Sequence, residues 1–86
     1  MSINKTEILS RLCYTEMVYG RVNKKLSTQF SKSEIEAMLH KVLAETEDSY
    51  FERIGKNIYA TNFEHQLKIT INSNTYRIIT VNRITK

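Results

Sequence analysis

The stretch LKITINSNTYRIITVNRI, residues 67–84, decides the fold class because apolar and polar residues alternate along it. Leu67, Ile69 and Ile71 would point to one side of an extended chain, and the residues between them would point to the other side. The polar run at residues 72–75 interrupts the alternation and predicts a turn. The stretch therefore predicts two antiparallel strands joined by a tight connection.

The pairing of these strands is predicted from their apolar residues, because a slip of one residue would exchange the two faces of a strand. A two-residue loop at Ser73 and Asn74 keeps apolar residues opposite each other. The facing pairs in this register are Ile71 with Tyr76, Thr70 with Arg77, and Ile69 with Ile78. Residues 57–61 would add a further strand, which completes a three-stranded antiparallel meander.

Helices are expected to cover one face of this meander and to leave the other face open. The residues expected on the open face are Lys68, Thr70, Arg77, Ile79, Val81 and Arg83. Ile79 and Val81 would form an apolar strip among the cations. This strip is either covered by the N-terminal helix or available to a partner.

The clearest helix begins after Ser31, where Ser31 and Glu34 have the spacing of a capping box. Apolar residues follow with the period of a helix that buries one face. The residues on that face are Ile35, Met38, Leu39, Val42 and Leu43. We therefore expect this helix to pack on the meander.

An earlier helix is expected to begin at Asn4, with Glu7 completing the cap. The residues at the two positions of a hydrophobic staple are Ile3 and Ile8. Either one helix continues to Leu26, or the chain breaks near Tyr14 and Thr15 into two helices. The fold class is thus α+β, with two or three N-terminal helices packed on the meander.

A short helical turn is expected between the second helix and the first strand. It would begin at Thr46 or Ser49, because the carboxylates that follow the second helix are unfavourable at a helix C-terminus. Its inward-facing residues would be Tyr50, Phe51 and Ile54. Gly55 would end it in a left-handed cap.

The 86 residues predict one domain, 1–86, with a helical part at about 4–54 and the meander at about 56–85. No apolar run approaches the length of a membrane span, and the N-terminus lacks the apolar core of a secretory signal. Cys13 has no partner for an intramolecular disulfide. These observations favour a cytoplasmic protein with no membrane contact.

Catalytic and cofactor-binding motifs are absent from the sequence. Two glycines, Gly20 and Gly55, are too few for a phosphate-binding loop or a nucleophile elbow. Cys13, His40 and His65 share no metal-ligand spacing, and Cys13 is expected to be a buried, inert thiol on the apolar side of a helix. We therefore expect no catalytic residue, no metal site and no cofactor.

Charge is distributed unevenly around a net charge of +4. Residues 31–52 hold six acidic and two basic side chains, whereas residues 53–86 hold six basic and one acidic. The electric field of this uneven charge distribution attracts an anionic partner to one side of the molecule. The candidate partner-binding residues are Arg21, Lys24, Lys25, Lys68, Arg77 and Arg83.

These features predict a small non-catalytic binding module whose basic surface engages an acidic protein or nucleic acid. Few aromatic residues are expected on the open face of the sheet, which favours the protein partner. By size and composition alone, an inhibitor of a bacterial defence nuclease, acting as anti-CRISPR proteins do, is one such module. The oligomeric state is left open.

Parts of the sequence resemble three known families. The run Val18–Leu26, together with Phe30–Lys32, Gly55–Asn57 and Thr70–Thr75, is similar to a small bacterial family catalogued as a domain of unknown function. This resemblance extends from Tyr14 to Arg83, and it implies a bacterial or phage origin without implying an activity.

The segment 33–61 resembles the last helix and wing of a winged helix-turn-helix, which would imply a DNA-binding regulator. Glu34 and Glu36 stand where a recognition helix would contact the major groove. The run Thr75–Ile79 loosely resembles a strand of the RelE-type ribonuclease toxins. That likeness would imply metal-free RNA cleavage, and its candidate residues are Glu64, His65, Tyr76, Arg77 and Arg83.

Overall fold

The computed structural model describes residues 4–84, in which three α-helices and one 3-10 helix are followed by a four-stranded sheet. Helix α1 (Lys5–Arg11) begins as expected, because Asn4 Oδ1 accepts a hydrogen bond from the Glu7 amide. The expected staple residue Ile3 lies outside the described residues. The α+β fold class is confirmed.

The first helical region consists of two helices, which decides between the two alternatives. Helix α2 (Glu16–Leu26) is separated from α1 by an extended linker. In this linker the Cys13 amide donates to the Tyr76 carbonyl, and the Ile78 amide donates to the Cys13 carbonyl. The linker is therefore fastened to the start of the last strand. The expectation of a buried Cys13 on a helix is wrong, because the residue lies in the linker and is exposed.

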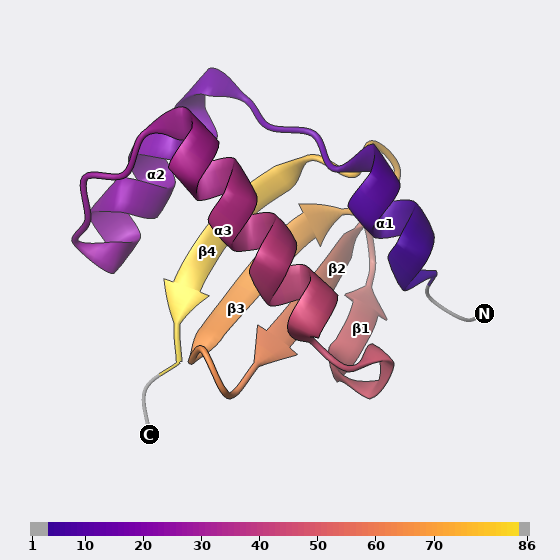
Figure 1. The fold of residues 1–86 in the computed structure, drawn as a ribbon. Coiled ribbons are helices and arrows are strands. Elements are labelled where there is room, and N and C mark those ends of the chain that lie inside the picture. Colours follow the sequence, from indigo (N-terminus) through magenta and orange to yellow (C-terminus); the bar gives the residue numbers. More distant parts are fainter. Residues whose placement is uncertain (1–3, 85–86) are drawn as a thin grey trace.

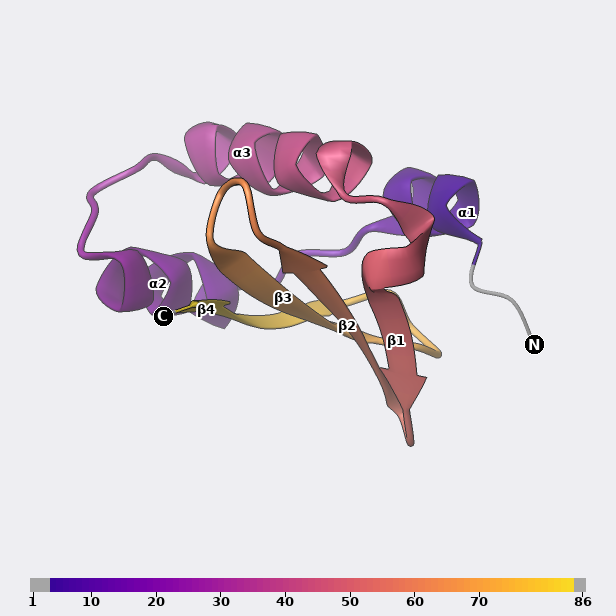
Figure 2. The ribbon, with the colours of Figure 1, turned by 90° about the horizontal axis from the view of Figure 1, so that it is seen from below.

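Helix α3 (Lys32–Glu45) has the predicted capping box, since Ser31 and Glu34 each bond the other's amide. Ile35, Leu39 and Val42 are buried on its inner side, as the spacing indicates. Figures 1 and 2 show that α3 lies across one face of the sheet. The predicted helix and its orientation are confirmed.

The segment after α3 is a 3-10 turn, η1 (Asp48–Tyr50), followed at once by strand β1 (Phe51–Ile54). The expected extent of the helical turn to Gly55 is wrong. Gly55, with a φ of +60°, is the first residue of the two-residue turn between β1 and β2 (Asn57–Asn62), where a positive φ is required. Phe51 is buried as expected, whereas Tyr50 and Ile54 are exposed.

The sheet is an antiparallel meander of four strands in the order β1-β2-β3-β4, with β3 (Leu67–Asn72) and β4 (Ile78–Arg83) forming its last hairpin. The expected three strands become four because β1 pairs along its full length with β2. Helices α1 and α3 lie on one side of the sheet, and α2 lies next to β4 (Figure 2). Among residues 4–84, no helix covers the opposite face of β1, β2 and β3.

The predicted register of the last hairpin is wrong. Ile71 pairs with Ile78 and Ile69 pairs with Val81, with a bulge between Thr70 and Ile71. The bulge allows both apolar pairs to face the core despite the extra residue on β4. Val81 is therefore buried against the helices and does not lie on the open face.

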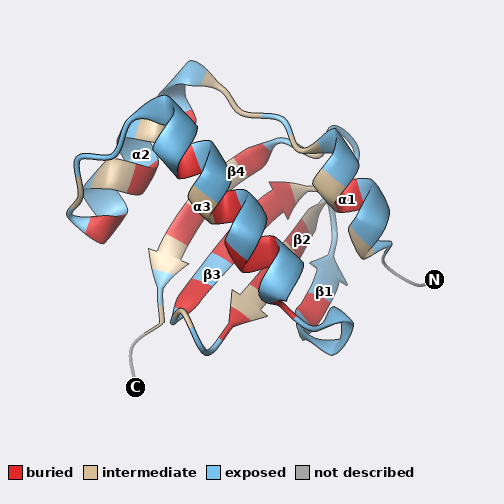
Figure 3. Ribbon diagram, in the orientation of Figure 1, coloured by how far each residue is buried: buried red, intermediate tan, exposed pale blue. Residues whose placement is uncertain are grey.

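The core lies between α3, α2 and the inner face of the sheet, as the band of buried residues in Figure 3 shows. It is built from aliphatic side chains, and the fully buried ones include Ile8, Val22, Ile35, Leu39, Leu43, Ile69, Ile71, Ile78 and Val81. None of the helices described is long and apolar enough to cross a membrane.

Candidate functional site

Three of the expected partner-binding cations come together on the exposed side of α2. Val18, Val22 and Leu26 are buried, and this turns the opposite side of the helix toward solvent. A hollow of about 590 Å³ lies there, and its lining residues are Arg21, Lys24, Lys25 and Thr80. We call these four residues the basic hollow. In the part of the chain that the structure describes, no carboxylate lines it.

Two arginines connect this region to the sheet. Arg83 Nη2 donates to the Leu26 carbonyl oxygen at 2.8 Å, and Arg21 Nη1 donates to the Ile79 carbonyl oxygen at 3.4 Å. Leu26 is the last residue of α2, where a cation is favoured by the helix dipole. The two arginines thus join α2 to β4.

Lys68 lies on the open face of the sheet, opposite Asn82 of β4. Its Nζ is 4.9 Å from the centroid of the Tyr59 ring, which is a cation–π distance. Arg77 lies far from Arg83, because it precedes β4 whereas Arg83 ends it, and a strand of that length spans about 20 Å. The structure thus gathers Arg21, Lys24 and Lys25 in the basic hollow and places Arg83 at the end of the same helix. Lys68 lies instead over Tyr59 of β2, on the β1 side of the sheet.

An aromatic surface that sequence reasoning missed lies at the β1 side of the same open face. Tyr50 and Phe63 are 46% and 53% exposed, and their rings meet edge to face with centroids 5.3 Å apart. They line a hollow of about 350 Å³, which we call the aromatic groove, with Ser49, Phe51, Glu52, Tyr59, Thr61 and Lys68. The expectation of few aromatic residues on this face is therefore wrong.

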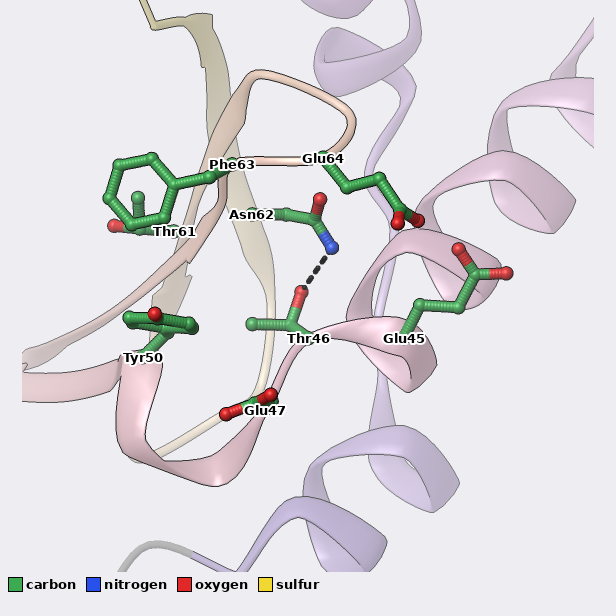
Figure 4. Close-up of a pocket in the computed structure, with 8 residues that line it drawn as sticks. All are labelled: Glu45, Thr46, Glu47, Tyr50, Thr61, Asn62, Phe63 and Glu64. Carbon is green, nitrogen blue, oxygen red and sulfur yellow. Dashed lines mark hydrogen bonds between the residues drawn. The ribbon is translucent and has the colours of Figure 1, made fainter.

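The acidic side chains gather near the C-terminal end of α3. Figure 4 shows Glu45, Glu47 and Glu64 around a hollow of about 180 Å³, with the Asn62 amide bonded to the Thr46 hydroxyl. His65 Nε2 lies 2.7 Å from Glu45 Oε1. This hydrogen bond is the main reason that the pKa of Glu45 is lowered from its ordinary value, with a further contribution from Lys41.

Glu45, Glu64 and His65 have ligand atoms within 4.8 Å of one another, a set that could hold a divalent cation. The sequence spacing did not predict this cluster, because the turn after β2 and the end of α3 come together only in the fold. The two glutamates are exposed, and the ion pair with His65 already accounts for the proximity. Proximity alone does not make this cluster a metal site.

The candidate ribonuclease residues are divided between the two ends of the sheet. Glu64 and His65 precede β3, whereas Tyr76 and Arg77 follow the turn after it. Tyr76 donates to Glu7 at 3.0 Å, and its ring lies under the Arg11 guanidinium. His40 is exposed on α3.

The wing-like segment does form a hairpin, β1–β2, but the helix before it lies across the sheet. Ile35 and Leu39 of α3 are buried in the core, and Glu34 and Glu36 are exposed. The solvent side of the helix therefore presents three carboxylates, those of Glu34, Glu36 and Glu45, against the two cations Lys32 and Lys41. Such a surface is unfavourable for contact with the phosphates that line a major groove.

A family model described as "Protein of unknown function (DUF3781)" matches residues 6–82. The chain belongs to this family. The expected membership of an uncharacterised domain family is thereby confirmed, and the matched range contains every helix and strand except the ends of α1 and β4. The chain matches no curated protein and no solved structure. Membership of the DUF3781 family assigns no activity, so function is argued from the surface alone.

Proposed function

We propose that this DUF3781 protein is a non-catalytic binding module that engages the phosphates of nucleic acid through the basic hollow. The observation that carries the proposal is the convergence of Arg21, Lys24 and Lys25 on one hollow that no carboxylate of residues 4–84 lines. None of these three makes an ion pair within residues 4–84, whereas Lys32 is paired with Glu16. Their charge is therefore available to a partner.

Nucleic acid is favoured over an acidic protein because cations and exposed aromatic side chains share one open face. Lys68 links the two groups, since it lines the aromatic groove and neighbours Asn82 of β4. Arginine adds bidentate contacts to phosphate that lysine does not make. With about six cations in play, the affinity should be modest and strongly dependent on salt.

The test compares two double charge reversals that change the net charge equally. Lys24→Glu with Lys25→Glu alters the basic hollow, whereas Lys41→Glu with Lys56→Glu alters exposed positions on α3 and in the β1–β2 turn. Binding to labelled single-stranded and double-stranded 20-mers is measured by fluorescence anisotropy from 50 to 200 mM salt. We expect the first pair to weaken binding at least tenfold, and the control pair to weaken it far less.

The slope of log K against log salt gives a second readout. It should become shallower by about 1.4 for the single strand when two phosphate contacts are lost. If both pairs of substitutions weakened oligonucleotide binding equally, only net charge would matter. This outcome would overturn the basic hollow as the binding site. No binding of wild-type protein to either oligonucleotide at 50 mM salt would overturn the nucleic-acid proposal. In that case an acidic protein surface becomes the partner to test.

A further inference from the structure

We infer that the partner is a single-stranded nucleic acid whose bases stack in the aromatic groove while its backbone runs toward the basic hollow. This inference rests on the proposed function and names the form of nucleic acid that the same face would take. It develops an observation that the choice of nucleic acid already uses, the exposed aromatic rings at the β1 side of the open face.

The register of the sheet places the two hollows on one face. Tyr59 of β2 pairs with Thr70 of β3, which pairs with Thr80 of β4, so the three residues form one row across the sheet, in which Thr70 is buried between two half-buried side chains. Tyr59 lines the aromatic groove, and Thr80 lines the basic hollow. Adjacent strands are about 4.8 Å apart, so the row spans about 10 Å. A short strand of nucleic acid can contact both hollows at once.

The exposed rings indicate unpaired bases rather than a duplex. Tyr50 and Phe63 offer apolar faces to solvent, and base pairs within a duplex cannot reach such faces because they are already stacked. Tyr59 is the third ring of the groove, and Lys68 stands 4.9 Å from its centroid. Lys68 is therefore placed to pair with the phosphate next to a stacked base.

Carboxylates on two sides oppose this binding mode. Tyr50 and Phe63 also line the hollow that holds Glu45, Glu47 and Glu64. Glu52 lines the aromatic groove and lies directly opposite Tyr59 in the β1–β2 pairing. A phosphate that passed between Lys68 and the rings would be repelled by it. Substituting Glu52→Gln keeps the shape of the side chain and removes the charge. We therefore expect this variant to bind the single strand more tightly than wild type.

The experiment measures anisotropy of single-stranded, abasic single-stranded and double-stranded 20-mers with wild type and with Tyr50→Ala/Phe63→Ala. Both substituted side chains are exposed, so the fold is expected to persist, and far-UV circular dichroism with a urea midpoint checks this. If even one base stacks on these rings, the double substitution should weaken binding to the single strand at least about fivefold. Duplex binding should be unchanged, and wild type should bind the abasic strand as weakly as the variant binds the normal strand.

The control Phe63→Leu keeps apolar volume without an aromatic face and should lose part of the affinity for the normal strand only. Equal effects on single strand and duplex, or no effect of Tyr50→Ala/Phe63→Ala, would overturn the stacking inference. If Lys24→Glu/Lys25→Glu still weakened both forms of DNA in that case, the proposed function would stand without it. If wild type bound no oligonucleotide, both proposals would fail together.

Discussion

Asn62 Nδ2 donates a hydrogen bond to Thr46 Oγ1 at 3.0 Å, and this contact joins the end of α3 to the end of β2. Asn62 is only 5% exposed. Its amide also donates to the Val42 carbonyl at 3.3 Å, and its Oδ1 accepts from the His65 amide at 2.7 Å. One buried side chain thus positions both segments that carry the acidic cluster.

Asn62→Leu should destabilise the protein by about 1–3 kcal/mol, because it leaves the His65 amide without its acceptor and Thr46 without a donor. Urea unfolding followed by circular dichroism measures the change. Thr61→Ala, at the neighbouring position on the opposite face, serves as the control and should stay within about 0.5 kcal/mol. A change below that limit for Asn62→Leu would show that the buried contact contributes nothing.

Asn23 has a comparable role in the connection between α2 and α3. Its Oδ1 accepts from the Thr28 hydroxyl at 2.8 Å and from the Phe30 amide at 2.9 Å, and its Nδ2 donates to the Phe30 carbonyl at 3.0 Å. Asn23→Ala removes all three bonds and should cost about 1–2 kcal/mol in urea unfolding. Gln29→Ala changes an exposed residue of the same loop and should have almost no effect.

The start of α1 and the whole of α3 could be predicted from sequence because their signals are local. Ser31 and Glu34 are three residues apart, and the buried residues of α3 follow at helical spacing, so both are visible without knowledge of the fold. Strand β1 could not be predicted in this way. Phe51 is buried and the three residues after it are all exposed, so the strand lacks the alternating pattern of burial. Only its pairing with β2 makes it a strand.

The register of the last hairpin could not be derived from apolar periodicity because periodicity does not count the residues in a loop. Asn72 Oδ1 accepts from the amides of Asn74 and Thr75, and Tyr76 has a φ of +59°. These local contacts make the loop longer than two residues. The aromatic groove was missed for a related reason. Tyr50 and Phe63 belong to turns, and their contact depends on how β1 and β2 pair.

Cys13 provides a direct test of the linker between α1 and α2. Its backbone bonds to Tyr76 and Ile78, while its side chain is exposed. The native protein should therefore react with Ellman's reagent at a rate close to that of the urea-unfolded chain, and Cys13→Ser should leave stability within about 0.5 kcal/mol. A native thiol that reacted at least a hundredfold more slowly would place Cys13 inside the core instead.

Tyr14 and Tyr19 should titrate later than ordinary tyrosines. Burial raises the pKa of Tyr14 to about 12, with Glu36 adding to the effect. The hydrogen bond that Tyr19 donates to Glu36 raises the pKa of Tyr19 to about 12. Because these folded-state pKa values exceed the unfolded value of 10.0, their stabilisation is complete below pH 10 and is lost as the pH rises toward 12.

Glu36→Ala separates the two causes in a spectrophotometric tyrosine titration. The pKa of Tyr19 should fall most of the way toward 10, because its hydrogen-bond acceptor is removed, whereas that of Tyr14 should fall little because its burial is kept. Tyr14→Phe and Tyr19→Phe assign the two titrations. A late titration of Tyr19 that survived Glu36→Ala would show that burial, rather than the hydrogen bond, controls it.

The contact between His65 and Glu45 predicts a loss of stability at acidic pH, whereas the tyrosines predict one at alkaline pH. Because His65 lowers the pKa of Glu45 below its ordinary value of 4.5, the folded state releases this proton more readily than the unfolded chain does. The stabilisation is therefore present above pH 4.5 and is lost as the pH falls through the lower, folded-state pKa.

Glu45→Gln should make the free energy of unfolding, measured in urea, fall less steeply over this acidic range. His65→Gln should flatten it similarly, whereas Glu47→Gln should leave the slope as steep as in wild type. A wild-type slope in Glu45→Gln would show that the contact contributes no acid sensitivity.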